Sequence, residues 1–251
     1  MEKRILQNVI AWAVALAVIF AVWSIAYFGV GNALIVPSFL DCARAFFALL
    51  SAGAFYKSLF ATLLRVVFAF VLSFVLAGVF ALGAYLSVYF AKILAPILAL
   101  LRCVPVLAVL LVFLLWVGAD SAPVLVAVLT LLPIFYTAFY TALMGVDKEL
   151  LEMSKVFCVP KKRQIKSLYL PALIRVSARE ASAGFALGLK LVVSAEVLAQ
   201  TAKSLGGRMQ EAKIYLDIPL LFALVLVVSI LGIAVEILGG WIDRKVERRM
   251  Q

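Results

Sequence analysis

Long runs of apolar residues, separated by short polar segments, dominate this chain. The hydrocarbon core of a bilayer is about 30 Å thick, so a spanning helix needs about 20 mostly apolar residues. The runs that meet this requirement, and in which we predict membrane-spanning helices, are 9–28, 59–84, 93–117, 122–145, 177–200 and 216–240. The pattern therefore predicts an all-α polytopic membrane protein with about six transmembrane helices, forming a single domain over residues 1–251.

The first apolar run follows Lys3 and Arg4, as it does in a secretory signal peptide. It is longer than a typical signal core, and five further runs follow, so we expect an uncleaved first span. The segment 29–58, which contains Asp41 and Arg44, is expected to include a short interfacial helix on the outer side.

The positions of Lys and Arg predict the orientation of these helices. With the N-terminus inside, 15 of the 23 basic residues fall in cytoplasmic segments, five fall outside and three lie within spans. Cytoplasmic loops are enriched in Lys and Arg, so both termini are predicted to lie in the cytoplasm. The three basic residues within spans are Arg65, Arg102 and Lys190.

The composition agrees with a lipid environment, because 67% of the residues are hydrophobic and only 14% are charged. A soluble domain carries about 25% charged residues. The net charge of +10 does not indicate nucleic acid as a partner, since the basic clusters lie between apolar runs without interleaved aromatics.

The sequence offers little for metal or cofactor chemistry. It has no His, its three cysteines (Cys42, Cys103 and Cys158) are far apart, and it lacks a phosphate-binding loop motif. We therefore expect no catalytic residue, no metal site and no cofactor bound by this chain.

The longest polar segment, residues 147–171, has the pattern of two short amphipathic helices. Asp147 can cap the first helix, in which Leu150, Met153 and Phe157 recur at helical spacing on one face. This helix is expected to end near residue 158.

Pro160 is suited to opening the second helix, and we expect Pro171 to close it. Its apolar residues gather on one side and its basic residues on another: Ile165, Leu168 and Tyr169, and Lys161, Lys162, Arg163 and Lys166. The inside-positive rule accounts for the charges but not for two unpartnered apolar faces. Exposed apolar stripes mark interaction sites, so the segment is predicted to bind a cytosolic partner.

The same segment carries a recognisable motif. Its pattern resembles the "EAA" motif of ABC importer permeases, E-A-A-x-x-x-G followed by a spacer and L-P. The matching residues are Glu152, Met153, Ser154, Cys158, Leu170 and Pro171.

Three further segments, in the same order along the chain, are similar to permeases of the nitrate, sulfonate and taurine type. Residues 63–83 resemble their second span. Their R-x-x-P…W-x-G and A-E-x-L…G-L-G segments are matched here by Arg102, Pro105, Trp116 and Gly118, and by Glu196 with Leu205-Gly206-Gly207.

The resemblance implies a type I (MetI-like) importer permease in the cytoplasmic inner membrane, working as a homodimer. Each copy would dock one cytosolic ATPase subunit, two in all, through a coupling loop at residues 146–171. Leu150 and Phe157 would join the motif residues in this contact. ATP and Mg would be bound by the ATPase, and an extracytoplasmic solute-binding protein would deliver the solute.

The sequence departs from the family motif at three positions. Met153 and Ser154 replace the paired alanines, and Cys158 replaces a glycine that supplies positive φ at low cost. Either the turn is built differently with help from Pro160, or docking is weaker, or the ATPase has a matching altered cleft.

Ionisable groups at bilayer depth are costly and normally face a bundle interior or a cavity. Arg102, Lys190 and Glu196 are therefore candidates for a translocation pathway that favours an anionic solute. The alternative is that they pair with other helices or backbone carbonyls and only hold the bundle together. Arg65 is expected to snorkel to the outer interface.

The sequence thus predicts the transmembrane subunit of an ATP-driven importer for a small, anionic or vitamin-like solute. One alternative is a stand-alone ion-coupled secondary transporter, although inverted repeats and broken helices are not evident. The other is a membrane scaffold whose loop recruits a cytosolic protein.

Overall fold

The computed structural model describes residues 2–32 and 34–249, and each regular element in these ranges is helical. The all-α fold class is therefore confirmed for the described chain. In chain order the elements are α1 Glu2–Val30, α2 Phe39–Ser51, α3 Gly53–Leu86, α4 Val88–Cys103, α5 Val106–Met144, α6 Lys148–Val156, α7 Lys161–Gln164, the π-helical turn η1 Ile165–Tyr169, α8 Leu170–Ala199, α9 Leu205–Ile214 and α10 Ile218–Arg249.

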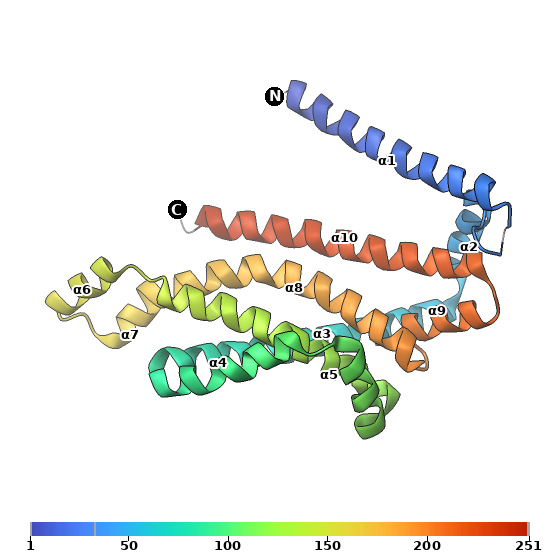
Figure 1. Cartoon of the computed structure of the whole chain (residues 1–251). Coiled ribbons are helices and arrows are strands. Elements are labelled where there is room, and N and C mark those ends of the chain that lie inside the picture. Colours follow the sequence, from blue (N-terminus) through green and yellow to red (C-terminus); the bar gives the residue numbers. More distant parts are fainter. Residues whose placement is uncertain (1, 33, 250–251) are drawn as a thin grey trace.

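Within the described residues, four helical stretches are long and apolar enough to cross a membrane: α3, α5, α10, and α8 together with α7 and η1. They cover the spans predicted at 59–84, 122–145, 177–200 and 216–240. The helix α1 covers the predicted span at 9–28, and α2 is the short helix predicted within 29–58. The helices α3, α5, α8 and α10 form the bundle, from which α1 diverges (Figure 1).

The prediction of one spanning helix at 93–117 is wrong. The helix α4 ends at Cys103, and Val104 is extended, with φ −71° and ψ 128°, because the ring of Pro105 disfavours helical backbone before it. A second break lies at Gly118, whose φ of 76° and ψ of 176° are accessible essentially only to glycine. The first part of α5 consequently turns away from the bundle (Figure 1).

Small side chains let α3 lie close to its neighbours. Its buried stripe recurs every three or four residues, and after Phe55 it consists of smaller side chains: Ser58, Thr62, Val66, Ala69, Ser73, Ala77, Ala81 and Ala84. The large rings of Phe135 and Phe139 on α5 share a core cluster with Ala77, Ala81 and Ala84. In a membrane the hydrophobic effect does not drive helices together, so their association depends on van der Waals packing. Small residues favour it because they let the helix backbones approach closely.

Two glycines on α8 serve the same purpose within the chain. A Cβ at Gly184 would lie 2.3 Å from the ring of Phe135, and one at Gly188 would lie 3.3 Å from Leu131. This face of α8 is therefore in contact with α5 of the same chain, as close packing between helices requires.

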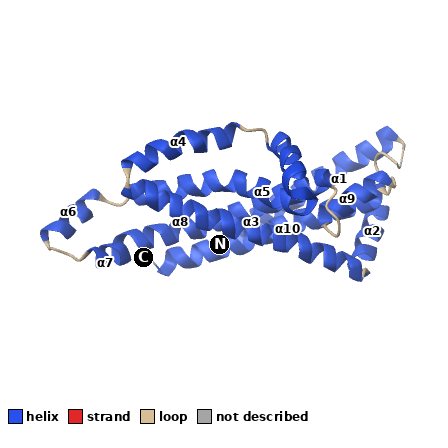
Figure 2. Ribbon diagram, turned by 90° about the horizontal axis from the view of Figure 1, so that it is seen from below, coloured by secondary structure: helices blue, strands red, loops and turns tan. Residues whose placement is uncertain are grey.

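The bundle has two distinct ends. The helices α6 and α7 project beyond it at one end, whereas α2 and α9 lie at the opposite end (Figures 1 and 2). Both described chain ends point toward the α6–α7 end (Figure 1). This arrangement agrees with the predicted topology, and the side of the membrane that each end faces stays a prediction.

Candidate functional site

The segment α6–α7 begins and ends its first helix as the sequence indicates. Asp147 starts α6, because its carboxylate accepts a hydrogen bond from the backbone N–H of Glu149 at 2.9 Å. At the other end the N–H of Val159 donates to the carbonyl of Ser154 at 2.8 Å, and Cys158 has φ 49°. This geometry is that of a Schellman turn, so Cys158 adopts the left-handed backbone that glycine usually provides there.

The second helix does not end where the sequence analysis places it. After α7 the chain continues through η1 into α8 without interruption, and the N–H of Leu170 donates to the carbonyl of Ile165 in a π-helical bond. Pro171 therefore lies inside a continuous helix, in the first turn of α8. The prediction that Pro171 closes the helix is wrong, because the wide turn before it accommodates a residue that lacks an N–H and crowds the preceding turn.

The apolar residues of α6 share one face, as predicted. Leu150, Met153 and Phe157 line a groove of about 310 Å³, to which Val159 and Leu168 also contribute. Phe157 is 73% exposed, and Leu150 and Met153 are exposed as well. We call residues 147–169 the hairpin and this depression the hairpin groove.

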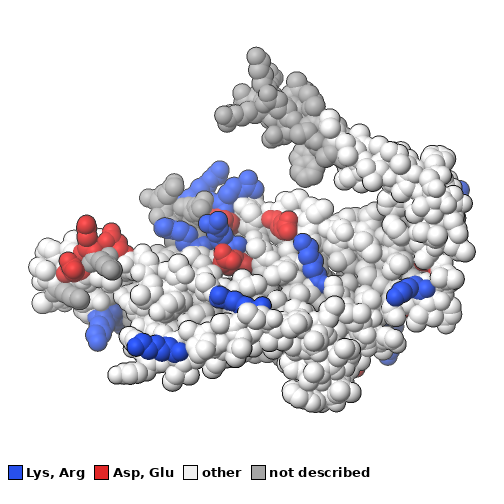
Figure 3. All heavy atoms as spheres, viewed as in Figure 1, with Lys and Arg blue, Asp and Glu red and all other residues white. Residues whose placement is uncertain are grey.

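The motif residues of α6 point in different directions. Glu152 and Met153 are exposed, whereas Ser154 is buried and its hydroxyl donates to the carbonyl of Leu151 at 2.7 Å. Acidic side chains gather on the upper side of the α6 end of the molecule in the view of Figure 3. The basic residues predicted on the second helix are all exposed: Lys161, Lys162, Arg163 and Lys166.

The hairpin is joined to the bundle at its base. The hydroxyls of Tyr169 in η1 and Tyr85 in α3 are hydrogen-bonded, and Tyr169 also packs against the core cluster that contains Phe135 and Phe139. A displacement of the hairpin therefore reaches α3 and α5 directly.

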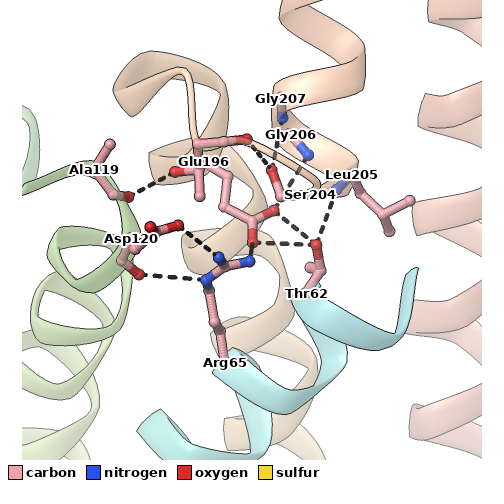
Figure 4. A network of polar contacts seen from close by, with 10 residues as sticks. Thr62, Arg65, Ala119, Asp120, Glu196, Ser204, Leu205, Gly206 and Gly207 are labelled. Carbon is pink, nitrogen blue, oxygen red and sulfur yellow. Dashed lines mark hydrogen bonds and ion pairs between the residues drawn. The ribbon is translucent and has the colours of Figure 1, made fainter. Parts of the chain in front are cut away.

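The other end of α8 carries a buried polar network centred on Glu196, whose side chain is 0% exposed. Its carboxylate accepts hydrogen bonds from the hydroxyl of Thr62 at 2.9 Å and from the N–H of Gly206 at 3.2 Å (Figure 4). The same hydroxyl of Thr62 accepts a bond from the N–H of Leu205. The network thus ties the ends of α3, α8 and α9 together.

Arg65 extends this network to the break in α5. Its guanidinium pairs with Glu196 at 3.2 Å and with Asp120 at 2.9 Å, and it also donates to the carbonyl of Asp120 (Figure 4). Two carboxylates hold the side chain of Arg65, which is 17% exposed, and its predicted reach to the outer interface stays a prediction. The neighbouring Ala119 carbonyl accepts a bond from the hydroxyl of Thr201. The residues after Gly118 are therefore fastened to α3 and to the α8–α9 connection.

Steric constraints explain why Gly206 and Gly207, the glycine pair of the matched motif, lack side chains. A Cβ at Gly206 would lie 2.4 Å from the Cβ of Glu196, and one at Gly207 would lie 2.1 Å from the carbonyl of Thr201. The N-terminus of α9 can approach Glu196 only because both side chains are absent. Thr62 and Asp120 were not predicted as part of this site from the sequence. A signal for the network was nevertheless present in the sequence. Glu196 is an acid within an apolar run and so requires a partner, and Arg65 lies at a similar depth in another predicted span.

The three candidate pathway residues do not lie together. Arg102 lies between α4 and α5, where it donates to the carbonyl of Pro133 at 3.2 Å and to the hydroxyl of Thr137. Lys190 is on the exposed side of α8, and Glu196 is in the buried network. Their predicted role in a pathway stays a prediction, while Arg102 and Glu196 have the structural partners that the alternative expects.

Comparison with known proteins gives a consistent result. The model of the family described as "binding-protein-dependent transport system inner membrane component" matches residues 69–248. A probable ABC transporter permease protein of Brucella melitensis biotype 1 is 28% identical over 215 residues, which cover 85% of this chain and 87% of the relative. A putative aliphatic sulfonates transport permease protein, SsuC of Bacillus subtilis, is 28% identical over 235 residues, covering 91% of this chain and 83% of the relative.

Proposed function

The chain belongs to the family of binding-protein-dependent transport system inner membrane components, and we propose that it is the transmembrane permease subunit of an ATP-driven importer. The observation that carries this proposal is the hairpin groove, which is apolar and exposed, with one wall on α6 and the other on the continuous helix that includes a candidate membrane span. A cytosolic ATPase subunit that binds the hairpin differently with and without ATP shifts the permease between outward-open and inward-open states.

The contact with the ATPase involves the residues of α6 and its following turn. Leu150, Met153 and Phe157 supply the apolar groove, and the exposed carboxylate of Glu152 lies elsewhere on the same helix. Cys158 shapes the turn, and Ser154 supports it from inside. Leu170 and Pro171 act at the base of the hairpin, where it becomes α8.

The proposed assembly contains two copies of this chain, two ATPase subunits that bind ATP and Mg, and an extracytoplasmic solute-binding protein. The family description, which names a dependence on a binding protein, supports this assembly. The excess of Lys and Arg in the hairpin and near both termini supports placing this end of the bundle in the cytoplasm.

The proposed cargo is a small anionic or vitamin-like solute. One relative carries the name of an aliphatic sulfonate permease, at 28% identity. The basic residue Arg102, which has neutral partners between α4 and α5, is the feature of this chain that favours an anion.

Proteoliposomes containing the permease, its ATPase and its binding protein test the proposal. The triple variant Leu150→Ser/Met153→Ser/Phe157→Ser is expected to insert normally and to lose ATP-dependent uptake by at least about tenfold, since buried apolar contacts dominate binding at interfaces. The control is Val156→Ser, which changes an exposed residue of α6 outside the groove.

Uptake that survives the triple variant would show that the hairpin groove is not the coupling contact. Uptake driven by an ion gradient without the ATPase would instead identify a secondary transporter, the rival function.

A further inference from the structure

A groove of about 530 Å³ lies between α4 and α5, apart from the hairpin groove and the Glu196 network. The helix α4 contributes Lys92, Ala95, Ala99 and Arg102, whose spacing of three, four and three residues places them on one helical face. The small alanine side chains leave the space between the two cations open. A cavity of this size is within the range that holds small organic ligands.

The facing wall comes from α5 and is aromatic and polar. Tyr136 and Tyr140 stack with ring centroids 5.6 Å apart, and the hydroxyl of Thr137 lies beside them. Arg102 donates to this hydroxyl and to the carbonyl of Pro133. These partners fix the guanidinium in place, but neither of them carries a charge.

The groove therefore has positive charge without a counter-charge. No Asp or Glu is among the residues that line it. The ion pairs found in the described part of the chain involve Arg44 and Arg65 but not Lys92 or Arg102. Arg102 has no carboxylate partner, and the exposed side chain of Lys92 adds a second positive charge to the same groove, so the groove favours an anionic occupant.

We propose that this groove binds an oxyanion, such as a sulfonate, phosphate or carboxylate, that is attached to a short apolar group. Arg102 supplies a fixed, charge-assisted hydrogen bond to the oxyanion, and Lys92 supplies a second positive charge. The apolar side chains of Val88 and Leu98 on the groove wall accommodate the rest of the molecule. Two sources offer this chemistry, the transported solute and the head group of an anionic phospholipid, and the assignment to the solute rests on the proposed function.

Direct binding to the full chain tests the inference without any transport assay. The protein is placed in nanodiscs of zwitterionic phosphatidylcholine, and sodium 1-butanesulfonate is titrated at constant ionic strength with 1-butanol as the uncharged control. The expected result is saturable binding of the sulfonate that weakens at least about tenfold in Lys92→Gln/Arg102→Gln. The matched control, Lys57→Gln, removes one positive charge from a different basic depression near α9 and is expected to bind as the wild type does.

A charge-preserving variant guards against a folding defect. Lys92→Arg/Arg102→Lys keeps both charges and is expected to bind butanesulfonate within about threefold of the wild type, whereas the glutamine pair does not. Thermal melting of all variants in the same nanodiscs reports whether each is folded. Equal weakening in the charge-preserving and glutamine variants would overturn the assignment of the groove as a charge-dependent site.

The second arm identifies the source of the oxyanion. The protein is purified from membranes that contain phosphatidylglycerol, and the phosphatidylglycerol retained per chain is measured by mass spectrometry. Retention that depends on Lys92 and Arg102 identifies a lipid head group, and butanesulfonate binding without such retention identifies a solute. If neither ligand depends on the two cations, the inference fails. The proposed function is tested separately, by ATP-dependent uptake in the hairpin variants.

Discussion

The hairpin and the Glu196 network lie at opposite ends of α8 and differ in how far their side chains have partners within the chain. In the network the carboxylates of Glu196 and Asp120 have partners on another helix, and in the described part of the chain no buried side-chain nitrogen or oxygen lacks a hydrogen-bond partner. In the hairpin the largest apolar side chains are exposed, and its turn places Cys158 in a left-handed backbone conformation. The first region is complete within the chain, whereas the second lacks something to pack against.

This contrast separates positions that maintain the fold from positions that are available for contact. Removing a side chain of the network should lower the free energy of unfolding, whereas removing an exposed side chain of the hairpin should leave it nearly unchanged. Matched pairs of variants, one from each region, test this distinction directly.

The largest difference in the free energy of unfolding is expected between alanine variants of one glutamate from each region, Glu196 and Glu152. Glu196→Ala removes a fully buried acceptor of bonds from Thr62, Gly206 and Arg65, so it should lower the free energy of unfolding by about 3–5 kcal/mol. Glu152→Ala changes an exposed residue of α6 and should alter stability by less than about 0.5 kcal/mol. Denaturant titration in detergent micelles, followed by circular dichroism, gives both values.

Similar losses for Glu152→Ala and Glu196→Ala would contradict the comparison, because the hairpin would then contribute to the fold as much as the network does.

The next effect concerns the break in α5. Gly118→Ala forces a side chain into φ 76°, ψ 176°, which should cost about 1–3 kcal/mol even though open space surrounds the site. Gly232→Ala in α10 also meets open space but has ordinary helical backbone, so it should be neutral or stabilise by up to about 1 kcal/mol. Thermal unfolding of the two variants in the same detergent separates backbone strain from the general effect of replacing glycine by alanine.

A destabilisation of equal size in both glycine variants would point to a general effect of Gly→Ala in these helices rather than to the strained break.

The smallest expected effect is a stabilisation of the hairpin turn by a substitution at Cys158. Cys158→Gly should relieve the left-handed strain and stabilise the turn by about 1 kcal/mol, partly offset by the greater freedom of glycine in the unfolded chain. Hydrogen exchange at the N–H of Val159, which closes the turn, should slow by up to about fivefold. Cys158→Ala keeps the strain and removes only the thiol, so exchange in that variant should match the wild type.

Exchange that slows equally in the alanine variant would attribute the effect to the thiol instead of the backbone.

The sequence predicted the parts of this molecule that depend on local pattern. The helices at 59–84, 177–200 and 216–240 follow from apolar run length, and the shared face of Leu150, Met153 and Phe157 follows from helical spacing. These features need only the periodicity of a helix and the thickness of a bilayer.

The parts that depend on distant partners could not be predicted. Thr62 and Glu196 are 134 residues apart in sequence, so their hydrogen bond depends on how α3 and α8 pack. Run length alone also missed the break at Val104, although Pro105 offered a local signal for it. Pro171 shows the reverse error, since a proline that usually ends a helix is tolerated after a π-helical turn.

The uninterrupted helix from Lys161 to Ala199 has 39 residues, which corresponds to about 58 Å at a rise of 1.5 Å per residue. At Gly184, near the middle of α8, the helix packs against the ring of Phe135 on α5, which leaves no room for a side chain. That contact is a natural pivot. A tilt of about 5° around it moves the hairpin end by about 3 Å and the Glu196 end by about 2 Å in the opposite direction. A force that displaces the hairpin sideways would therefore displace the Glu196 end of the helix in the opposite direction.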